Sequence, residues 1–128
     1  MSVLEDNKYN LEMWQGATFT MTITVKDSAG NTQNLTGYSA RMQMRSSYAS
    51  GSITESMSSA NGEITITPSE GNLTFQLAAT RTAAIPVDLN NGRPPKTIYV
   101  YDLELIDGAN NVSKLLYGDV NVYGEVTR

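Results

Sequence analysis

Residues 97–106, near the C-terminal end of the chain, divide with a period of two into two faces, one that carries tyrosines and leucines and one that carries Asp102 and Glu104 among aliphatic residues. This alternation is typical of a β-strand with one buried face, because successive side chains of a strand point to opposite sides, whereas a helix repeats every ~3.6 residues. Turn residues follow at 107–111, and residues 112–126 return to an extended pattern. The end of the chain is therefore predicted to form a β-hairpin. The face predicted to be buried carries Tyr99, Tyr101, Leu103 and Leu105.

The same alternation recurs upstream in short segments separated by turn residues about every eight to twelve positions. These segments are 9–13, 18–26, 38–45, 53–57, 63–67 and 73–77. Residues 78–85 contain good helix formers and end before Pro86, so we expect one short helical crossover there. The expected fold is all-β: an antiparallel immunoglobulin-like β-sandwich of roughly seven to eight strands, with a closed barrel as the alternative. Tyr101 suits the role of the tyrosine corner known from such sandwiches.

A chain of 128 residues most naturally forms one domain. We assign residues 1–8 to a polar N-terminal arm, expected to be mobile until it meets a partner, and residues 9–128 to a single immunoglobulin-like domain. The side chains on the predicted inner faces should be largely buried between the two sheets. They are Phe19, Met21, Ile23, Val25, Met42, Met44, Ile64, Ile66, Leu73, Phe75, Leu77, Leu103 and Leu105.

Side chains that commonly perform chemistry are scarce in this sequence. The chain has no cysteine and no histidine, which excludes disulfides and thiolate metal sites and removes the usual base for a Ser or Thr nucleophile. Asp102 and Glu104 share one strand face and could in principle serve in glycoside hydrolysis or help bind Ca²⁺. We interpret them as a solvated or ion-paired face, and the turns that begin at Asp27 and Asp107 as hairpin turns. We therefore expect no enzyme, no catalytic residue, no cofactor and no metal.

The charge pattern argues against several kinds of partner. The net charge is −4 and the basic residues are scattered, the tightest grouping being Arg93 with Lys96. Nucleic-acid binding requires a concentrated cationic surface, so no nucleic-acid partner is expected. The longest apolar run falls far short of the ~20 residues that span a bilayer, so no membrane contact is expected. Residues 1–8 lack the features of a signal peptide, which favours synthesis in a cytoplasm.

Two loops have the least structural justification and are our candidates for protein contacts. Tyr48 lies in the Ser/Gly-rich loop 46–52, where an interface and an idle loop are both open interpretations. In the loop 87–96, two cationic residues flank a Pro-Pro dipeptide, and the stiffened backbone lowers the ordering cost of docking. A solvated loop is the alternative for this segment too. The predicted interface residues are Tyr48, Arg93, Pro94, Pro95 and Lys96.

Two blocks of the sequence resemble a known group of proteins. The first is W-Q-G-A-T-F-T-M-T-I-T-V-K-D-S-A-G-N at 14–31, continued by N-L-T-G-Y-S-A-R-M-Q-M-R at 34–45. It resembles the opening of many small tailed-phage virion proteins: a G-x-T-F strand, a D-x-x-G turn, then L-T-G and a strand ending in a basic residue. It is also similar to the immunoglobulin-like N-terminal domain of phage baseplate upper proteins, which anchors receptor-binding parts to the tail. The second block, at 101–105, 115–122 and 125–128, resembles how the small virion proteins end, and the two blocks together cover about half the chain.

The resemblance implies a non-enzymatic structural protein of the virion, a tail or baseplate adaptor that joins larger tail or fibre components. Nothing in the chain resembles the long coiled-coil or receptor-binding extension of a full baseplate upper protein, which favours a small adaptor over an adhesin. A capsid decoration protein, and a free carbohydrate- or protein-binding module, are the alternatives. The implied partners are other virion proteins of the tail, baseplate, fibre or capsid, with multiple copies in each particle. The implied location is the virion, after synthesis in the bacterial host cytoplasm.

Overall fold

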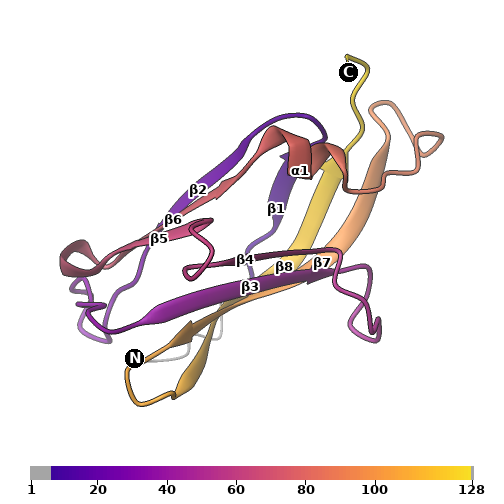
Figure 1. Ribbon diagram of the computed structural model, residues 1–128. Helices are drawn as coiled ribbons and strands as arrows, with labels where there is room; N and C mark the ends of the chain where they lie inside the picture. Colours follow the sequence, from indigo (N-terminus) through magenta and orange to yellow (C-terminus); the bar gives the residue numbers. More distant parts are fainter. Residues whose placement is uncertain (1–6, 128) are drawn as a thin grey trace.

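Eight strands form two layers in the computed structural model of the protein, which describes residues 7–127 (Figure 1). The larger layer is a five-stranded sheet in the order β1 (Leu11–Trp14), β8 (Val112–Tyr123), β7 (Lys96–Ile106), β3 (Ser39–Arg45) and β4 (Glu55–Ser58). The smaller layer is a three-stranded sheet in the order β2 (Phe19–Thr24), β6 (Asn72–Leu77) and β5 (Ile64–Thr67). A 3₁₀ turn, η1 (Pro68–Glu70), joins β5 to β6, and the helix α1 (Ala79–Ala83) carries the chain from the smaller sheet toward the larger one.

The order of the strands identifies the fold as an immunoglobulin-like β-sandwich. The neighbours β8, β7, β3 and β4 correspond to strands G, F, C and C′ of that fold, and β2, β6 and β5 correspond to B, E and D. All paired strands are antiparallel apart from β1 with β8. The predicted all-β sandwich with one short helical crossover is confirmed, and the division into two sheets excludes the closed barrel.

The direction of the first strand is a feature that the alternation did not predict. β1 runs parallel to β8, with Leu11 opposite Val120. Alternation shows which face of a strand is buried, but it is the same in both directions of the chain and so does not distinguish parallel from antiparallel pairing.

The parallel pairing continues upstream of β1. The Tyr9 N–H donates to the Tyr117 carbonyl (2.8 Å), and the Tyr117 N–H donates to the Asn7 carbonyl (3.1 Å). Lys8 also forms a parallel bridge with Tyr117. The last two residues of the predicted arm, Asn7 and Lys8, are therefore attached to the larger sheet, and residues 1–6 lie outside the described residues.

The core between the two sheets contains most of the side chains predicted for it. Val25, Met42, Met44, Ile64, Leu73, Phe75, Leu77, Leu103 and Leu105 are buried. The prediction is wrong for Phe19, Met21, Ile23 and Ile66, which are half-buried. These four lie on β2 and β5, the two outer strands of the smaller sheet, where one flank has no neighbouring strand within the sheet. Buried side chains that we did not predict include Leu11, Met13, Leu35, Met57, Val120 and Val122.

The two Asp-initiated turns have the same hydrogen bonding. Asp27 Oδ1 accepts from the N–H groups of Ala29 and Asn31 (2.9 and 3.0 Å), and Asp107 Oδ1 accepts from the equivalent positions two and four residues on (both 2.9 Å). Such side-chain bonds to the following backbone stabilise tight turns. The prediction of hairpin turns at both places is confirmed, because Lys26 pairs with Thr32 across the first turn and β7 pairs with β8 across the second.

Arg81 on α1 ties together the outer strands of the two sheets. Its guanidinium forms ion pairs with Glu55 of β4 and with Glu63 just before β5 (2.7 Å to Glu63), and it donates to the Ser56 carbonyl (2.9 Å). Glu63 in turn accepts from the Ser58 N–H (3.2 Å). The Ser56 carbonyl and the Ser58 N–H point away from β3. The side chains of Arg81 and Glu63, which bond them, therefore lie along the outer edge of β4.

Candidate protein-interaction site

The predicted interface residues lie on both sides of the first half of β7 and do not form one surface. Tyr48 is in the β3–β4 loop, which follows Arg45, the partner of Val100 in β7. Residues 93–95 are in the loop between α1 and β7, and Lys96 is the first residue of β7 (Figure 1). Residues 93–95 line one groove, Tyr48 lines a separate cavity, and Lys96 lines neither.

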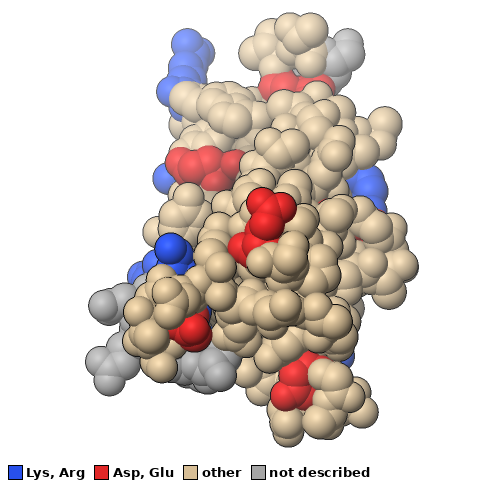
Figure 2. All heavy atoms as spheres, turned by 90° about the vertical axis from the view of Figure 1, so that its left-hand side faces the viewer, with Lys and Arg blue, Asp and Glu red and all other residues tan. Residues whose placement is uncertain are grey.

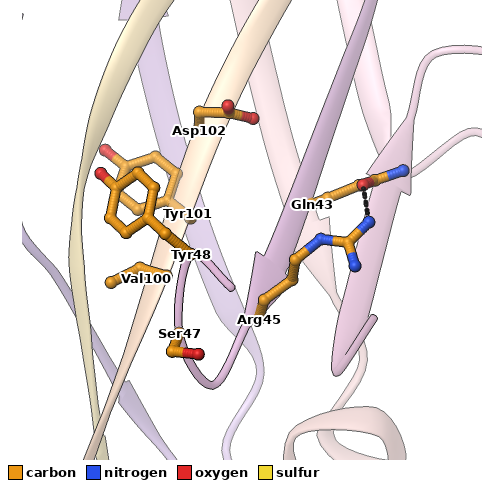
Figure 3. Close-up of a pocket in the computed structure, with 7 residues that line it drawn as sticks. All are labelled: Gln43, Arg45, Ser47, Tyr48, Val100, Tyr101 and Asp102. Atoms are coloured by element: carbon orange, nitrogen blue, oxygen red, sulfur yellow. Dashed lines mark hydrogen bonds between the residues drawn. The ribbon is translucent and has the colours of Figure 1, made fainter. Parts of the chain in front are cut away.

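The Tyr48 cavity is a small depression on the outer face of the larger sheet. Figure 3 shows Tyr48, Val100 and Tyr101 on one side of it and Gln43 and Arg45 on the other. Arg45 donates to Gln43 Oε1 and to the Ser50 carbonyl (3.0 Å each), which holds the loop against the sheet. Tyr48 itself is 77% exposed.

The size of this cavity limits what it can bind. Its volume is about 150 Å³, which is below the roughly 300–1,000 Å³ of small-molecule sites. It can accept a single side chain of a partner, and the exposed Tyr48 ring offers a contact surface at its rim.

The groove beside residues 93–95 is larger and has apolar walls. Its volume is about 650 Å³, and it is lined by Trp14, Arg93, Pro94, Pro95, Gly124, Glu125, Val126 and Thr127. The Arg93–Pro94 peptide bond is cis. The loop is held in place because the Asn91 side chain donates to the Lys96 carbonyl (2.7 Å) and the Gly124 N–H donates to the Pro95 carbonyl (2.9 Å).

Trp14 is the largest side chain of this groove, and Tyr123 holds it in place. The two rings stack with centroids 4.7 Å apart and planes at 23°. The Tyr123 hydroxyl donates to Glu12 Oε1 (3.1 Å), and this hydrogen bond raises the pKa of Tyr123 above its usual value. Trp14 remains 47% exposed. The stack therefore presents a rigid aromatic surface whose immobilisation on binding costs little entropy.

Two further tyrosines of β7 anchor the core. The Tyr99 hydroxyl donates to the Pro86 carbonyl (2.5 Å) and the Tyr101 hydroxyl to the Tyr9 carbonyl (2.6 Å). Burial raises the pKa of both hydroxyls, so both stay protonated as donors. The prediction that Tyr101 acts as the tyrosine corner is wrong, because its hydroxyl bonds the distant Tyr9 carbonyl, whereas the bond to the connection between α1 and β7 is made by Tyr99.

Asp102 and Glu104 form an ion-paired cluster, as we interpreted them from the sequence. Lys114 Nζ lies 2.8 Å from Asp102 Oδ2 and 2.5 Å from Glu104 Oε2, and Arg41 Nε lies 2.6 Å from Glu104 Oε1. The hydrogen bonds from Lys114 and then Arg41 lower the pKa of Glu104. A general acid of a glycosidase needs a raised pKa, so Glu104 lacks the electrostatics of that role.

Metal sites and membrane-spanning helices are not found in the described part of the chain. Within residues 7–127, no group of three His, Cys, Asp or Glu side chains is placed to hold a metal ion. No helix in the same range is long and apolar enough to cross a membrane. The face seen in Figure 2 is mainly uncharged, and its Lys and Arg side chains form no continuous patch.

No family model matches. No curated protein sequence matches the chain either. Among solved structures, the chain is similar to the extracellular domain of the voltage-gated sodium channel beta4 subunit, with 10% identity, a TM-score of 0.44 and coverage of 98% of this chain and 99% of that one. It is also similar to a chain of the ICOS complex with ICOS-L and an anti ICOS-L VNAR domain, with 8% identity, a TM-score of 0.40 and coverage of 91% of this chain and 54% of that one. A third similar structure is that of Drosophila OTK, extracellular domains 3–5, with 14% identity, a TM-score of 0.30 and coverage of 91% of this chain and 32% of that one. Similarities this low say nothing of function.

The sequence analysis missed Trp14 and residues 124–127 as walls of the groove. Trp14 meets Tyr123 only through the parallel pairing of β1 with β8, which is not encoded in the alternation of either strand. One signal was present in the sequence: Trp14 comes directly after the apolar position Met13, so a regular strand places its ring on the outer face.

Proposed function

We propose that the protein is a non-enzymatic structural protein of a tailed-phage virion, an adaptor at the tail or baseplate that joins larger tail or fibre components. The observation that carries this proposal is the rigid groove of Trp14 and residues 93–95, which lies on an immunoglobulin-like scaffold and beside the last described residues of the chain. The assignment to a virion rests on the two sequence blocks described above. Synthesis in the bacterial host cytoplasm belongs to the same proposal.

The chemistry of the groove suits a protein partner. Tryptophan, tyrosine and arginine are the residues most enriched among those that dominate binding energy in protein interfaces. Here Trp14 and Arg93 lie in one groove, and Tyr123 holds the tryptophan ring in place. Pro94 and Pro95, which follow Arg93, restrict the backbone of the loop, so less conformational entropy is lost when a partner docks.

The two sequence blocks fall mainly on the scaffold. The first spans the strands β2 and β3 with the turn between them, and the second lies on β7 and β8. The groove takes walls from both blocks, since Trp14 opens the first and residues 125–127 belong to the second, whereas residues 93–95 belong to neither. We therefore expect the scaffold to be shared with other small virion proteins and residues 93–95 to select the particular neighbour.

The location is tested by cryo-electron microscopy and cross-linking of intact particles from the virus whose genome encodes the chain. We expect multiple copies at the tail or baseplate. Density on the capsid surface would instead support a decoration protein. Absence from purified particles, combined with binding to a glycan array, would support a free binding module and contradict the proposal.

The groove is tested by substitution in that virus. We expect Trp14→Ala and Arg93→Ala to reduce the yield of complete particles while the purified variants keep the melting temperature of the parent within a few degrees. Lys26→Ala is the matched control for Arg93→Ala, because Lys26 is an exposed cation outside the groove. Normal assembly of both groove variants would place the interface elsewhere on the molecule.

A further inference from the structure

The strand β2 has one edge that pairs with no other strand of the described residues. It is an outer strand of the smaller sheet, with β6 on one side only (Figure 1). Its sequence, F-T-M-T-I-T, contains no charge and no proline, and its pairing with β6 shows no bulge. Exposed edges of this kind pair readily with other strands, and proteins commonly protect them with charges, prolines, bulges or a covering element.

The register with β6 shows which backbone groups of β2 point outward. Residues of the two strands pair so that Thr22 lies opposite Thr74, and the Val25 N–H donates to the Gly71 carbonyl (2.8 Å) in the same register. Hydrogen-bonded and non-hydrogen-bonded pairs alternate along an antiparallel ladder. Thr20, Thr22 and Thr24 are therefore the positions whose N–H and C=O groups point away from β6. Within residues 7–127, these groups have no hydrogen-bond partner.

The edge of β4 shows how the same fold protects a comparable strand. Its outward groups at Ser56 and Ser58 are bonded by the side chains of Arg81 and Glu63. β4 also has only four residues, against six in β2. Within the described residues, β2 is thus longer than β4, and no side chain bonds its outward backbone groups.

We propose that a second copy of this chain covers the β2 edge, in an antiparallel pairing of β2 with β2 about a two-fold axis centred on Thr22. In this register Thr20 lies opposite Thr24 of the second copy, and Thr22 lies opposite its own equivalent. All outward backbone groups are then paired, because each pair exchanges both of its N–H···O bonds. Two-fold symmetric contacts are the commonest form of homo-oligomer.

The side chains on both faces of β2 are compatible with this pairing. On the outer face, threonines meet threonines, which is a favourable cross-strand combination. Lys26 lies opposite Thr18 of the second copy and Asp27 opposite Ala17, so no like charges face each other. On the inner face, Phe19, Met21 and Ile23 are half-buried, and the equivalent residues of the second copy would cover part of their exposed surface.

The contact is small, so we expect a weak dimer. An edge pairing of one short strand buries less than the roughly 1,200–2,000 Å² of a stable, specific interface. Sedimentation velocity from about 10 μM to about 1 mM covers the affinity range of such contacts. The dimer does not depend on whether the protein belongs to a virion.

Thr22→Pro tests the register directly. Proline removes the N–H that points outward and places its ring where the second copy would pair, but it breaks no backbone bond to β6. The long hydrogen bond between the Thr22 and Thr74 hydroxyls (3.5 Å) is lost in Thr22→Pro and in the valine control alike. We expect this variant to keep the circular dichroism spectrum of the parent and to remain monomeric throughout the series. Thr22→Val, the matched control, keeps the N–H and the β-branched shape and should dimerise like the parent. A parent chain that stays monomeric, or a Thr22→Pro variant that dimerises equally well, would overturn the proposal.

Amide hydrogen exchange of the unmodified chain provides a test that requires no variant. The amides of Thr20, Thr22 and Thr24 should exchange more slowly as the dimer forms at higher concentration, whereas those of Met21 and Ile23, already bonded to β6, should change little. Protection of the threonine amides that is independent of concentration would show that the chain covers the edge itself. Dimerisation only after deletion of residues 2–6 would identify that segment as the cover. Either result would contradict the proposed contact.

Discussion

Phe75 and Phe19, the two phenylalanines of the chain, distinguish core from edge at the scale of single residues. Phe75 is fully buried on β6, the central strand of the smaller sheet, whereas Phe19 is half-buried on β2. We expect Phe75→Ala to lower the free energy of unfolding by about 3–5 kcal/mol, because lost burial and the remaining cavity both contribute. Phe19→Ala should cost clearly less. Urea titration measures both, and a loss below about 1 kcal/mol for Phe75→Ala would show that its face is assigned wrongly.

The burial of single residues was predicted more completely for the central strands than for the outer ones, where Ile64 of β5 is buried as predicted but four other residues are not. The alternation along β3, β6 and β7 correctly placed Met42, Phe75 and Leu103 in the core. The same reasoning failed for Met21, because it assumes a neighbour on both flanks of the strand. The position of a strand within its sheet depends on contacts between distant segments, and this information is absent from local periodicity.

At the scale of elements, the contact of Arg81 with Glu63 makes stability depend on pH. Burial raises the pKa of Glu63, but the hydrogen bonds from Arg81 and the Ser58 N–H more than offset this, so its pKa is lowered overall. The unfolded chain then binds a proton more readily than the folded one. This contribution to stability is present above the unfolded pKa of about 4.3 and is lost as the pH falls through the folded value.

We therefore expect Arg81→Met to weaken the dependence of unfolding free energy on pH below neutrality. The neutral side chain no longer stabilises the ionised form of Glu63, so less stability remains to be lost on acidification. Denaturant titrations at pH 7 and at about pH 3, on either side of the carboxyl range, measure the effect. Arg93→Met is the control, since Arg93 lies outside this ion-pair cluster, and it should keep the slope of the parent. Equal slopes for both variants would contradict the assignment.

Element boundaries followed from the sequence more closely than the links between elements. Turn residues and Pro86 correctly bracketed the hairpins and the short helix. The contact of Arg81 with Glu55 joins residues 26 positions apart through the packing of α1 against the sheet edges. The candidate groove could not be predicted for the same reason, because its Trp14 ring stacks on Tyr123 from the opposite end of the chain. Both the Arg81–Glu55 contact and the Trp14–Tyr123 stack depend on how distant segments align with each other. The composition of a single segment does not contain this information.

At the scale of the whole molecule, the two sheets and their shared core should hold the fold together without a metal ion. The carboxylates of Asp102 and Glu104 are engaged by Lys114 and Arg41, and those of the two hairpin turns hold backbone N–H groups. We expect the melting temperature to be unchanged by EDTA, measured by circular dichroism with and without the chelator. A fall of several degrees that added Ca²⁺ reverses would show that a cation stabilises the molecule.

The parallel ladder of β1 and β8 has a mechanical consequence. β1 begins toward the end of the sandwich that carries the last hairpin turn, and β8 ends beside Trp14 at the opposite end. Tension applied between the first and last described residues would pull these two neighbouring strands in opposite directions along their length. The bonds between them would then bear the load together, in shear, instead of opening one after another. If the chain were stretched between two larger proteins, the hydrogen bonds between β1 and β8 would therefore be the first to resist the force.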